Sequence, residues 1–265
     1  MRFYSIKEAF RLSAFFIAFI FISAEIAAAE CSVKHYDMMA TVKRVVDGDT
    51  VTLVDKRKVR LIGINTPELA HYSKKTEAYA LAAKQYLQTQ LVANKRIYLK
   101  FGKQKKDHYG RLLAHLFLKD GRNINAMLVK QGLASAIVVP PNIALINCYF
   151  KLEQHARKKE KNIWSVGSFK YIDADKLKIN DTGFSFIKGK VIRVGKSRGS
   201  IWLQLAAEFT LRIKRKDFKY FKNFDLKNLK REDLKDKILS VRGWVYKWKD
   251  ELYMQIRHPK MINGL

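Results

Sequence analysis

The sequence predicts a mainly β protein with some α-helix: a five-stranded barrel of the OB type with helices, followed by a second OB-like β-barrel. Two observations favour this class. Short runs that alternate apolar and polar residues are separated by turn residues, and a few inserted segments carry apolar residues at helical spacing. Because the helices are inserted between groups of strands, a small barrel fits better than an alternating parallel sheet.

The first half opens with three strand-like runs. Residues 39–46 alternate up to a turn at Asp47 and Gly48, and runs at 50–54 and 59–64 complete a three-strand meander. The other elements expected here are strands at 96–101, 112–118 and 133–139, helices at 77–91, 125–131 and 152–161, and an exposed basic loop around Lys103, Lys105 and Lys106.

A second pattern of strands follows a polar stretch. Residues 169–182 have the composition of a linker. Beyond it, strands are expected at 184–194, 201–205, 209–213, 238–246 and 252–256, with a helical stretch near 217–220. The predicted organisation is a signal peptide at 1–29, a first barrel at 30–168, a linker at 169–182, and a second barrel at 183–265 that resembles nucleic-acid-binding OB modules in its general pattern.

The N-terminus has the pattern of a secretory signal. Basic residues precede an apolar stretch at 12–24 that is short for a membrane span, and alanines at 27–29 offer a cleavage site. An uncleaved anchor is the alternative, although Glu25 interrupts the apolar run. We therefore expect a periplasmic or secreted protein with no stable membrane span after cleavage, acting as a monomer.

The chain is strongly basic. Lys and Arg total 52 against 24 Asp and Glu, which gives a formal charge of +28. Such a field attracts polyanions, so a polyanion is the expected partner. General solubility or attachment to an anionic membrane surface would also account for the charge alone.

The two cysteines, Cys31 and Cys148, both follow the proposed cleavage site. An even number of cysteines in an exported domain favours a disulfide, which here would close a long loop. The alternative is a metal held by Cys31, His35, Cys148 and His155, whose spacing matches no compact zinc pattern. His71, His108 and His115 are assigned no role.

Residues suited to phosphodiester chemistry lie at the ends of the predicted strands. An acidic turn covers 47–50, Arg60 begins a strand that leads into 65–68, and Arg111 follows the basic loop. Cleaving a phosphodiester requires positive charge to neutralise the phosphate and a carboxylate to activate water. Taken singly, each of these residues is equally typical of a hairpin turn or a surface ion pair.

Four short motifs occur in one order: VVDGDTV, RLIGINTPE, DHYGR and NIW. In this order and at these separations they resemble the thermonuclease family, the staphylococcal-type nucleases, over residues 39–165. The resemblance implies a nuclease that hydrolyses phosphodiester bonds of DNA and RNA and leaves 3′-phosphate products.

The resemblance also implies a Ca²⁺ site. Asp49 and Asn65 would supply side-chain oxygens and Thr66 its backbone carbonyl, and such hard ligands suit calcium. The family carries a carboxylate where this chain has Asn65. One negative charge is therefore missing, and weaker calcium binding or a changed metal preference is the hypothesis.

The resemblance assigns catalytic roles to three residues and substrate binding to a fourth. Glu68 would be the general base on the attacking water, and Arg60 and Arg111 would bind the scissile phosphate. Tyr109 would contact the substrate base. The competing function is a noncatalytic exported DNA-binding protein of the same fold, in which Asn65 marks a lost metal site.

Aromatic residues are frequent in the second predicted barrel. Trp202, Trp244, Tyr246 and Trp248 lie among Lys and Arg, a composition that favours base stacking as well as ordinary packing. About half of them are expected in the core.

Overall fold

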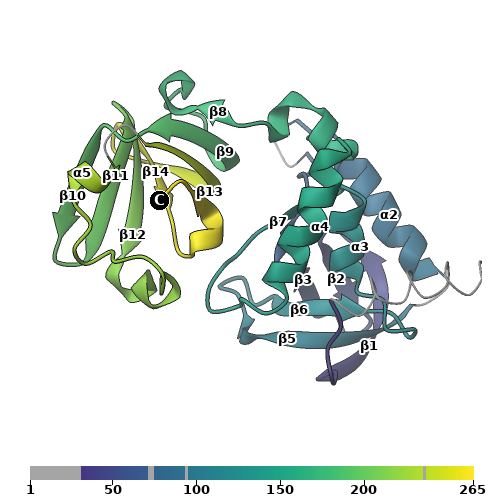
Figure 1. Ribbon diagram of the computed structural model, residues 1–265. Helices are drawn as coiled ribbons and strands as arrows, with labels where there is room; N and C mark the ends of the chain where they lie inside the picture. The colour runs from purple at the N-terminus through teal and green to yellow at the C-terminus, as the bar shows by residue number, and fades with distance from the viewer. Residues whose placement is uncertain (1–30, 71–74, 93–94, 235–236) are drawn as a thin grey trace, which may run out of the picture.

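The computed structural model describes residues 31–70, 75–92, 95–234 and 237–265, so the predicted leader and His71 lie outside the described residues. Two groups of strands form the two halves of the molecule, and helices accompany the N-terminal half (Figure 1). No helix in these ranges is long and apolar enough to cross a bilayer.

The N-terminal strands close into a barrel in the order β1-β2-β3-β6-β5, in which β3 and β6 are parallel. This confirms the predicted barrel. Alternate side chains point into it, because successive residues of a strand face opposite sides of the sheet. The strands are β1 (Met38–Val45), β2 (Thr50–Leu53), β3 (Lys58–Leu61), β5 (Arg96–Lys106) and β6 (Leu112–Phe117).

Strand β5 continues through the segment predicted as a basic loop. The side chain of Asn142 acts as a substitute strand partner: its Oδ1 accepts from the Gln104 amide at 2.8 Å and its Nδ2 donates to the Gln104 carbonyl at 3.0 Å. Gly102 lets Asn142 approach, since a Cβ there would lie 2.4 Å from Asn142 Cγ. The lysines of this segment therefore project from a strand rather than from a loop. That strand is stabilised by Asn142, which lies far away in the sequence.

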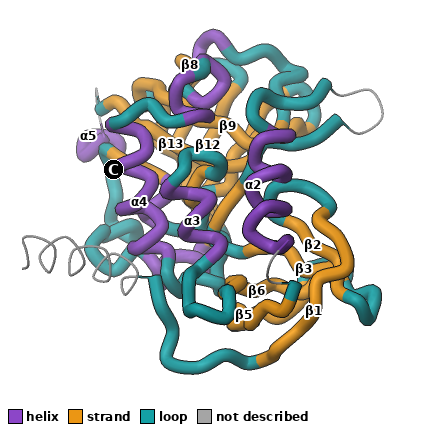
Figure 2. Tube along the Cα trace, turned by 90° about the vertical axis from the view of Figure 1, so that its right-hand side faces the viewer, coloured by secondary structure: helices purple, strands orange, loops and turns teal. Residues whose placement is uncertain are grey.

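Helices α2 (Ala80–Val92), α3 (Ile124–Lys130) and α4 (Ile146–Lys158) pack beside the barrel (Figure 2). Asn123 caps α3 by accepting from the Ala126 amide at 3.0 Å, as favoured at a helix start. The predicted helix at 152–161 begins earlier, at Ile146, directly after Leu145 in the left-handed conformation. The predicted strand at 133–139 contracts to β7 (Ser135–Ala136), which pairs with β4 (Ile64–Asn65).

The C-terminal strands form one sheet in the order β10-β11-β12-β14-β13-β9-β8, with β15 on β13. This confirms a second strand-rich unit. The expected run at 184–194 divides into β9 and β10. The strands are β8 (Ile172–Asp173), β9 (Gly183–Lys190), β10 (Arg193–Ser197), β11 (Ser200–Ala206), β12 (Phe209–Lys214), β13 (Ile238–Trp248), β14 (Glu251–Gln255) and β15 (Ile262–Asn263).

The second unit approaches a barrel along one seam. A Cβ on Gly189 of β9 would lie 3.1 Å from Leu205 Cβ of β11, so these two strands come close together. No strand ladder joins β9 to β11 in the described part of the chain. The predicted helical stretch is the short 3-10 helix η4 (Arg215–Tyr220), and a short α5 (Arg231–Leu234) follows.

The segment expected as a linker is structured. Phe169 is buried and packs edge-on against Trp164, with ring centroids 5.9 Å apart. Ile172 and Asp173 form β8, which runs parallel to β9. The connection between the two units is therefore packed against both of them at several points.

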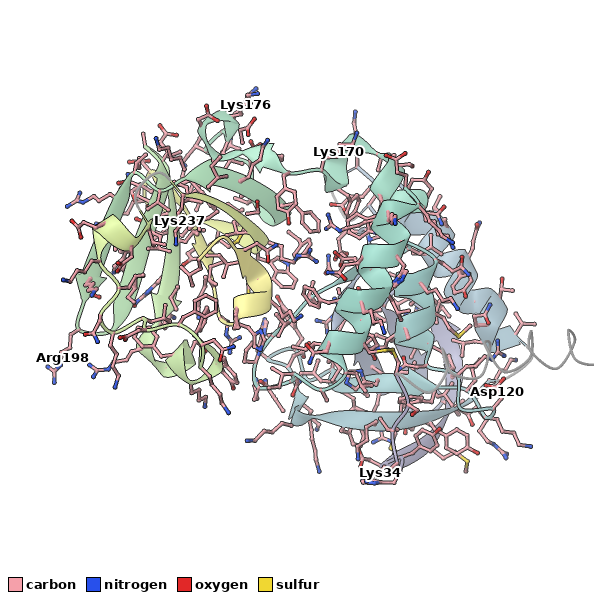
Figure 3. The ribbon with its side chains drawn as sticks, in the orientation of Figure 1. Lys34, Asp120, Lys170, Lys176, Arg198 and Lys237 are labelled. Atoms are coloured by element: carbon pink, nitrogen blue, oxygen red, sulfur yellow. A yellow bond between two sulfur atoms is a disulfide. The ribbon has the colours of Figure 1, made fainter. Side chains whose placement is uncertain are left out.

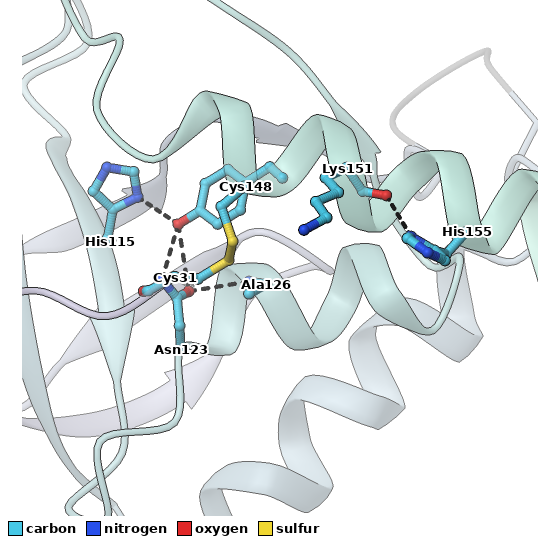
Figure 4. The surroundings of a disulfide bond; sticks show 8 residues. Cys31, His115, Asn123, Ala126, Cys148, Lys151 and His155 are labelled. Atoms are coloured by element: carbon cyan, nitrogen blue, oxygen red, sulfur yellow. Dashed lines mark hydrogen bonds between the residues drawn. A yellow bond between two sulfur atoms is a disulfide. The ribbon is translucent and has the colours of Figure 1, made fainter. Parts of the chain in front are cut away.

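A disulfide ties the N-terminal segment to α4. Cys31 and Cys148 are bonded, with their Cα atoms 5.7 Å apart (Figure 4). This confirms the predicted pairing and excludes the alternative metal site on the same two cysteines. Beside it the Tyr149 hydroxyl lies 2.7 Å from His115 Nδ1 and accepts from Asn123 Nδ2 at 3.1 Å. His115 is thus a buried structural residue.

The two halves are joined by a buried ion cluster. Glu153 of α4 is 2% exposed, and Arg242 of β13 reaches both of its oxygens, at 2.7 and 2.9 Å. Arg157 and the Ala136 amide donate to the same carboxylate at 2.7 and 2.6 Å. With four donor contacts, the buried charge of Glu153 is well compensated.

Charged side chains project from both halves (Figure 3). The labelled Lys34, Lys170, Lys176 and Arg198 lie at widely separated points of the outline. The positive field that composition predicts therefore belongs to the whole molecule, and it brings a polyanion to the surface without selecting the site at which it binds.

Candidate active site

The turn between β1 and β2 places an acidic side chain inside the protein. Asp47 accepts from the Asp49 amide at 3.0 Å, which fixes the turn. A Cβ on Gly48 would lie 2.7 Å from Ala83 Cβ and 2.8 Å from Thr66 Cβ, so the turn can pack here only with glycine. As a result Asp49 is 4% exposed and points toward Thr66.

Asp49 organises the residues around it through both oxygens. Its Oδ2 accepts from the Thr66 amide at 3.1 Å and from the Thr66 hydroxyl at 3.0 Å. The same oxygen lies 3.0 Å from Arg60 Nη2, and Oδ1 accepts from the Thr50 hydroxyl at 3.2 Å. These donors replace the hydrogen bonds to water that the Asp49 carboxylate loses on burial.

Arg60 is held from several directions. Besides Asp49, its guanidinium donates to Asn65 Oδ1 at 3.3 Å and to the Ile64 carbonyl at 3.1 Å, and it also contacts the Leu61 carbonyl. Strand β3 positions it on the outer side of the barrel next to Leu113 of β6. Its orientation is therefore fixed before any substrate arrives.

Glu68 stands at the edge of this network. Its amide donates to Glu77 Oε2 at 2.9 Å, and its carbonyl accepts from the Glu77 amide at 2.9 Å, which anchors the backbone. Among the described residues, no hydrogen bond uses the Glu68 carboxylate. Partial burial, and then the charges of Asp49 and Asp47, raise the pKa of Glu68 above its ordinary value.

Asp47 belongs to the same electrostatic group. Burial, and then repulsion by Asp49, raise the pKa of the Asp47 carboxyl. Three carboxyl groups therefore crowd one arginine, Arg60. An additional positive charge at this place would lower the repulsion among them.

Arg111 lies just before β6 on a separate turn. Its Nε donates to Asp107 Oδ2 at 2.7 Å, and Asp107 Oδ1 accepts from the amides of Tyr109 and Arg111 at 2.9 Å each. Burial acts to raise the pKa of Asp107, but the hydrogen bonds from Arg111 hold it below its ordinary value. The register next to Arg60 places Arg111 on the same side of the barrel.

Tyr109 lies at the tip of this turn and is 73% exposed. Its ring is 5.5 Å from the Arg111 guanidinium carbon and 3.8 Å from the centroid of His108. No contact joins Tyr109 or Arg111 to Asp49 or Glu68 among the described residues. The structure thus places these residues as a second group beside the first.

A cavity of about 500 Å³ opens beside Glu68. The N-terminal half contributes Asn65 and Glu68 to it, while Phe184 and Trp244 come from β9 and β13 of the C-terminal sheet. The other lining residues are Leu69, Lys75, Glu77, Ala78, Phe169, Thr182, Gly183 and Phe186. The second half of the molecule therefore forms a wall of the site.

Comparison with known proteins gives matches confined to part of the chain. The family described as "Staphylococcal nuclease homologue" matches residues 58–166. A thermonuclease of Staphylococcus intermedius is 39% identical over 127 residues, which cover 46% of this chain and 74% of that protein. The chain belongs to the staphylococcal nuclease family. This confirms the resemblance drawn from the four motifs.

Other members of the staphylococcal nuclease family give similar matches. A thermonuclease of Staphylococcus hyicus is 37% identical over 127 residues, covering 46% of this chain and 73% of that protein. The SPbeta prophage-derived endonuclease YokF of Bacillus subtilis is 32% identical over 166 residues, covering 60% of this chain and 52% of that protein. The family match ends at residue 166, before the second sheet begins with β8 at Ile172.

The structure brings together four of the residues singled out in the sequence: Asp49, Arg60, Asn65 and Thr66. Sequence reasoning missed three kinds of support for the site. Asp107, four residues before Arg111, was available as a turn-forming acid in the DHYGR motif. Glu77, which holds the Glu68 backbone, and the Phe184–Trp244 wall carry no local sequence signal, because both depend on tertiary packing.

Proposed function

We propose that this member of the nuclease family is an exported, calcium-dependent enzyme that hydrolyses phosphodiester bonds of DNA and RNA to 3′-phosphate products. The observation that carries the proposal is the buried Asp49–Arg60–Asn65–Thr66 cluster with the Glu68 carboxylate free beside it. A phosphate clamp and a base lie together there, and the adjoining cavity gives a substrate access.

The donor set of this cluster fits a calcium ion. Asp49, Asn65 and the Thr66 carbonyl offer oxygen atoms only, which hard cations prefer. The described residues contain no group of three or more His, Cys, Asp or Glu side chains able to hold a metal, so Asn65 and a backbone oxygen must complete the set. When bound, the ion would neutralise charge on the phosphate.

Glu68 is proposed as the general base. It takes a proton from water as the water oxygen bonds to phosphorus and the bond from phosphorus to the 5′-oxygen breaks. The leaving oxygen gains a proton and becomes a 5′-hydroxyl, while the phosphate remains on the 3′-oxygen. Because Glu77 fixes the Glu68 backbone at both its amide and its carbonyl, the base is held in place.

Arg60 and Arg111 are proposed to bind the phosphate oxygens. Each guanidinium is anchored by a carboxylate, Arg60 by Asp49 and Arg111 by Asp107. Prepositioned donors stabilise the charge that develops in the transition state with little reorganisation. Tyr109, exposed beside Arg111, is proposed to contact a substrate base.

We also propose that residues 30–168 carry the chemistry and that residues 183–265 bind substrate. The disulfide supports export, since such bonds persist in oxidising compartments. The proposed leader lies outside the described residues. The proposed location of the exported protein is the periplasm or the surrounding medium.

The test is cleavage of DNA and RNA by the purified protein with calcium or with chelator. Glu68→Gln should lower kcat by about 10²- to 10⁴-fold, the usual contribution of general acid–base catalysis. Asp55→Asn is the matched control, because among the described residues Asp55 pairs with the exposed Arg57 alone. Cleavage that is equal in chelator, or equal in Glu68→Gln and wild type, would contradict the proposal. Salt-sensitive binding without cleavage would favour a noncatalytic binding protein.

A further inference from the structure

One side of strand β13 carries a row of aromatic side chains. Trp244, Tyr246 and Trp248 alternate with other residues and therefore face the same side of the sheet. They are 42%, 37% and 58% exposed. Trp202 of β11 is also partly exposed, so the expectation that about half of these four residues lie in the core is wrong.

The inner end of this row lies at the active site. Trp244 lines the cavity that contains Glu68, and its ring packs edge-on against Phe184 at a centroid distance of 5.1 Å. Two residues earlier on the same face, Arg242 is fixed to Glu153. This anchor sets the position of Trp244 relative to the catalytic half.

The outer end of the row joins a cluster of rings. Tyr246 stacks on Tyr253 of β14 at 5.9 Å, and Tyr253 also contacts Trp248 at 5.8 Å and Trp202 at 6.0 Å. A hollow of about 390 Å³ lies beside them. Its lining includes Trp202, Trp248 and Tyr253, together with Arg193 and Lys196.

Cations accompany the rings. The Arg212 guanidinium carbon lies 4.6 Å from the Trp202 ring centroid, and Lys249 Nζ lies 5.3 Å from that of Trp248. Arg193 and Lys196 border the same hollow. Exposed rings beside cations fit single-stranded nucleic acid, because the rings stack on bases and the cations bind phosphates.

We propose that Trp244, Tyr246, Trp248 and Trp202, supported by the buried Tyr253 between them, form an aromatic track that guides single-stranded nucleic acid into the catalytic cavity. The bases stack along β13, and the strand reaches Glu68 at the Trp244 end. A duplex keeps its bases stacked inside, so the track selects unpaired strands. The inference rests on the proposed function for the position of the cleavage site, while binding to the track can be measured without cleavage.

The length of the track gives a specific test. Trp244 and Trp248 are four residues apart in a strand, roughly 13 Å at the usual rise per residue. A dinucleotide held over Glu68 is too short to cover this distance, whereas a 20-nucleotide strand covers all of it. Loss of the outer rings should therefore affect long substrates much more than short ones.

The first measurement is the Kd of a fluorescent 20-nucleotide thymidine strand, with chelator present to prevent cleavage. Trp248→Ala should weaken binding about tenfold, and Trp244→Ala combined with Trp248→Ala about a hundredfold, in line with the known size of base stacking on aromatic residues. Trp248→Phe should restore most of the loss. Ile238→Ala is the control, because Ile238 is 64% exposed at the other end of β13 and should leave Kd unchanged.

The second measurement is kcat/KM for the 20-nucleotide strand divided by kcat/KM for a dinucleotide. Trp248→Ala should lower this ratio about tenfold. Equal losses of kcat/KM on both substrates would overturn the proposal. It would also be overturned if Trp248→Ala bound the 20-nucleotide strand as tightly as Ile238→Ala does. A self-association that Trp248→Ala abolishes, with Kd unaltered, would reassign the face to a dimer contact. If wild type binds the strand through the track but cleaves nothing, the proposed function fails and the track stands.

Discussion

The two sheets of this molecule share a strand order but differ in what they carry. In the N-terminal barrel the third and fifth strands, β3 and β6, are parallel neighbours, and in the C-terminal sheet β12 and β14 have the same relation. The first barrel places Asp49 and its partners at strand ends, while the second displays rings and cations on an outer face. One topology thus supports two different surfaces, since activity depends on side chains rather than on the fold itself.

The two halves also differ in how they are stabilised. The first has three helices of seven or more residues among the described ranges and the disulfide at Cys148. The second relies on its strands, short helical turns and apolar interior. We therefore expect perturbations of the first half to leave the second largely intact, and four changes test that expectation.

The largest effect is expected from replacing both cysteines, Cys31→Ser with Cys148→Ser. The bond spans 117 residues, and closing a loop of that size stabilises the folded state by about 5 kcal/mol in the chain-entropy account. Urea unfolding followed by hydrogen exchange should show the loss in the N-terminal barrel. An equal loss of protection in β11 and β12 would mean that the halves unfold as one unit.

A somewhat smaller effect is expected from Arg242→Leu, which removes one partner of the buried Glu153. Breaking a buried ion pair from one side typically costs about 3 to 5 kcal/mol, and Arg157 remains to limit the loss. Thermal unfolding should then separate into two transitions, one for each half. Lys247→Leu, on an exposed site of the same strand, is the control, and a single unchanged transition would contradict the role of Arg242 as an anchor.

Next in size is the pH dependence of the first half, which depends on His115. Burial lowers the pKa of His115 from 6.5 to about 4. Among the described residues, no group forms a hydrogen bond with its Nε2, so the charge of a protonated ring would be left without a partner there. The unfolded chain binds a proton at His115 more readily than the folded chain does. The contribution of the neutral His115 to the free energy of unfolding is therefore fully present above about pH 6.5 and is lost as the pH falls toward 4. The contribution is on the order of 3 kcal/mol.

His115→Gln tests this contribution, because it removes the titration while keeping a polar group near Tyr149. The variant should be less stable at neutral pH, and the fall in its unfolding free energy between pH 6.5 and 4 should be smaller than in wild type. Urea unfolding across this range measures it. An identical pH profile in both proteins would remove His115 as the cause.

The smallest effect is expected from Asn65→Asp. The new carboxylate adds negative charge next to Asp49, and the calcium concentration at half-maximal activity should fall about tenfold, or roughly 1.4 kcal/mol. A calcium titration of cleavage measures this change. Asn125→Asp is an unsuitable control because Asn125 donates to the Ile62 carbonyl, so Asn223→Asp, on an exposed turn, serves instead. Equal calcium dependence in wild type and Asn65→Asp would show that this position does not hold the metal.

Local patterns in the sequence were enough to predict most strands of both halves. Alternation identifies β1 and β3, because each buries mainly one side. Strand β2 is buried on both sides and is recognised by the turns that bound it. The start of α4 at Ile146 was missed, since the left-handed Leu145 before it has no signature in composition. The extension of β5 was missed for a different reason: its partner is the Asn142 side chain, about forty residues away.

The site was predictable where a motif contains it and hidden where packing creates it. Asp49, Arg60, Asn65 and Thr66 lie in two short motifs, and the structure brings them into contact as the motifs imply. The wall made by Trp244 was not predictable, because it requires β13 to dock against α4. Its exposure also contradicts the usual burial of tryptophan, which a composition argument favours.

The Arg242–Glu153 contact affects how much conformational entropy the protein loses when a substrate binds. The two halves are attached at several places, which include the packed chain around Phe169, this ion cluster and the hydrogen bond from Arg257 to the Pro140 carbonyl, so their mutual rotation is already restricted in the free protein. The side of the cavity that carries Trp244 and the side that carries Glu68 are consequently held in place before a substrate binds. The entropy of bringing them together is lost once, during folding, and each cleavage cycle begins with the cavity already assembled.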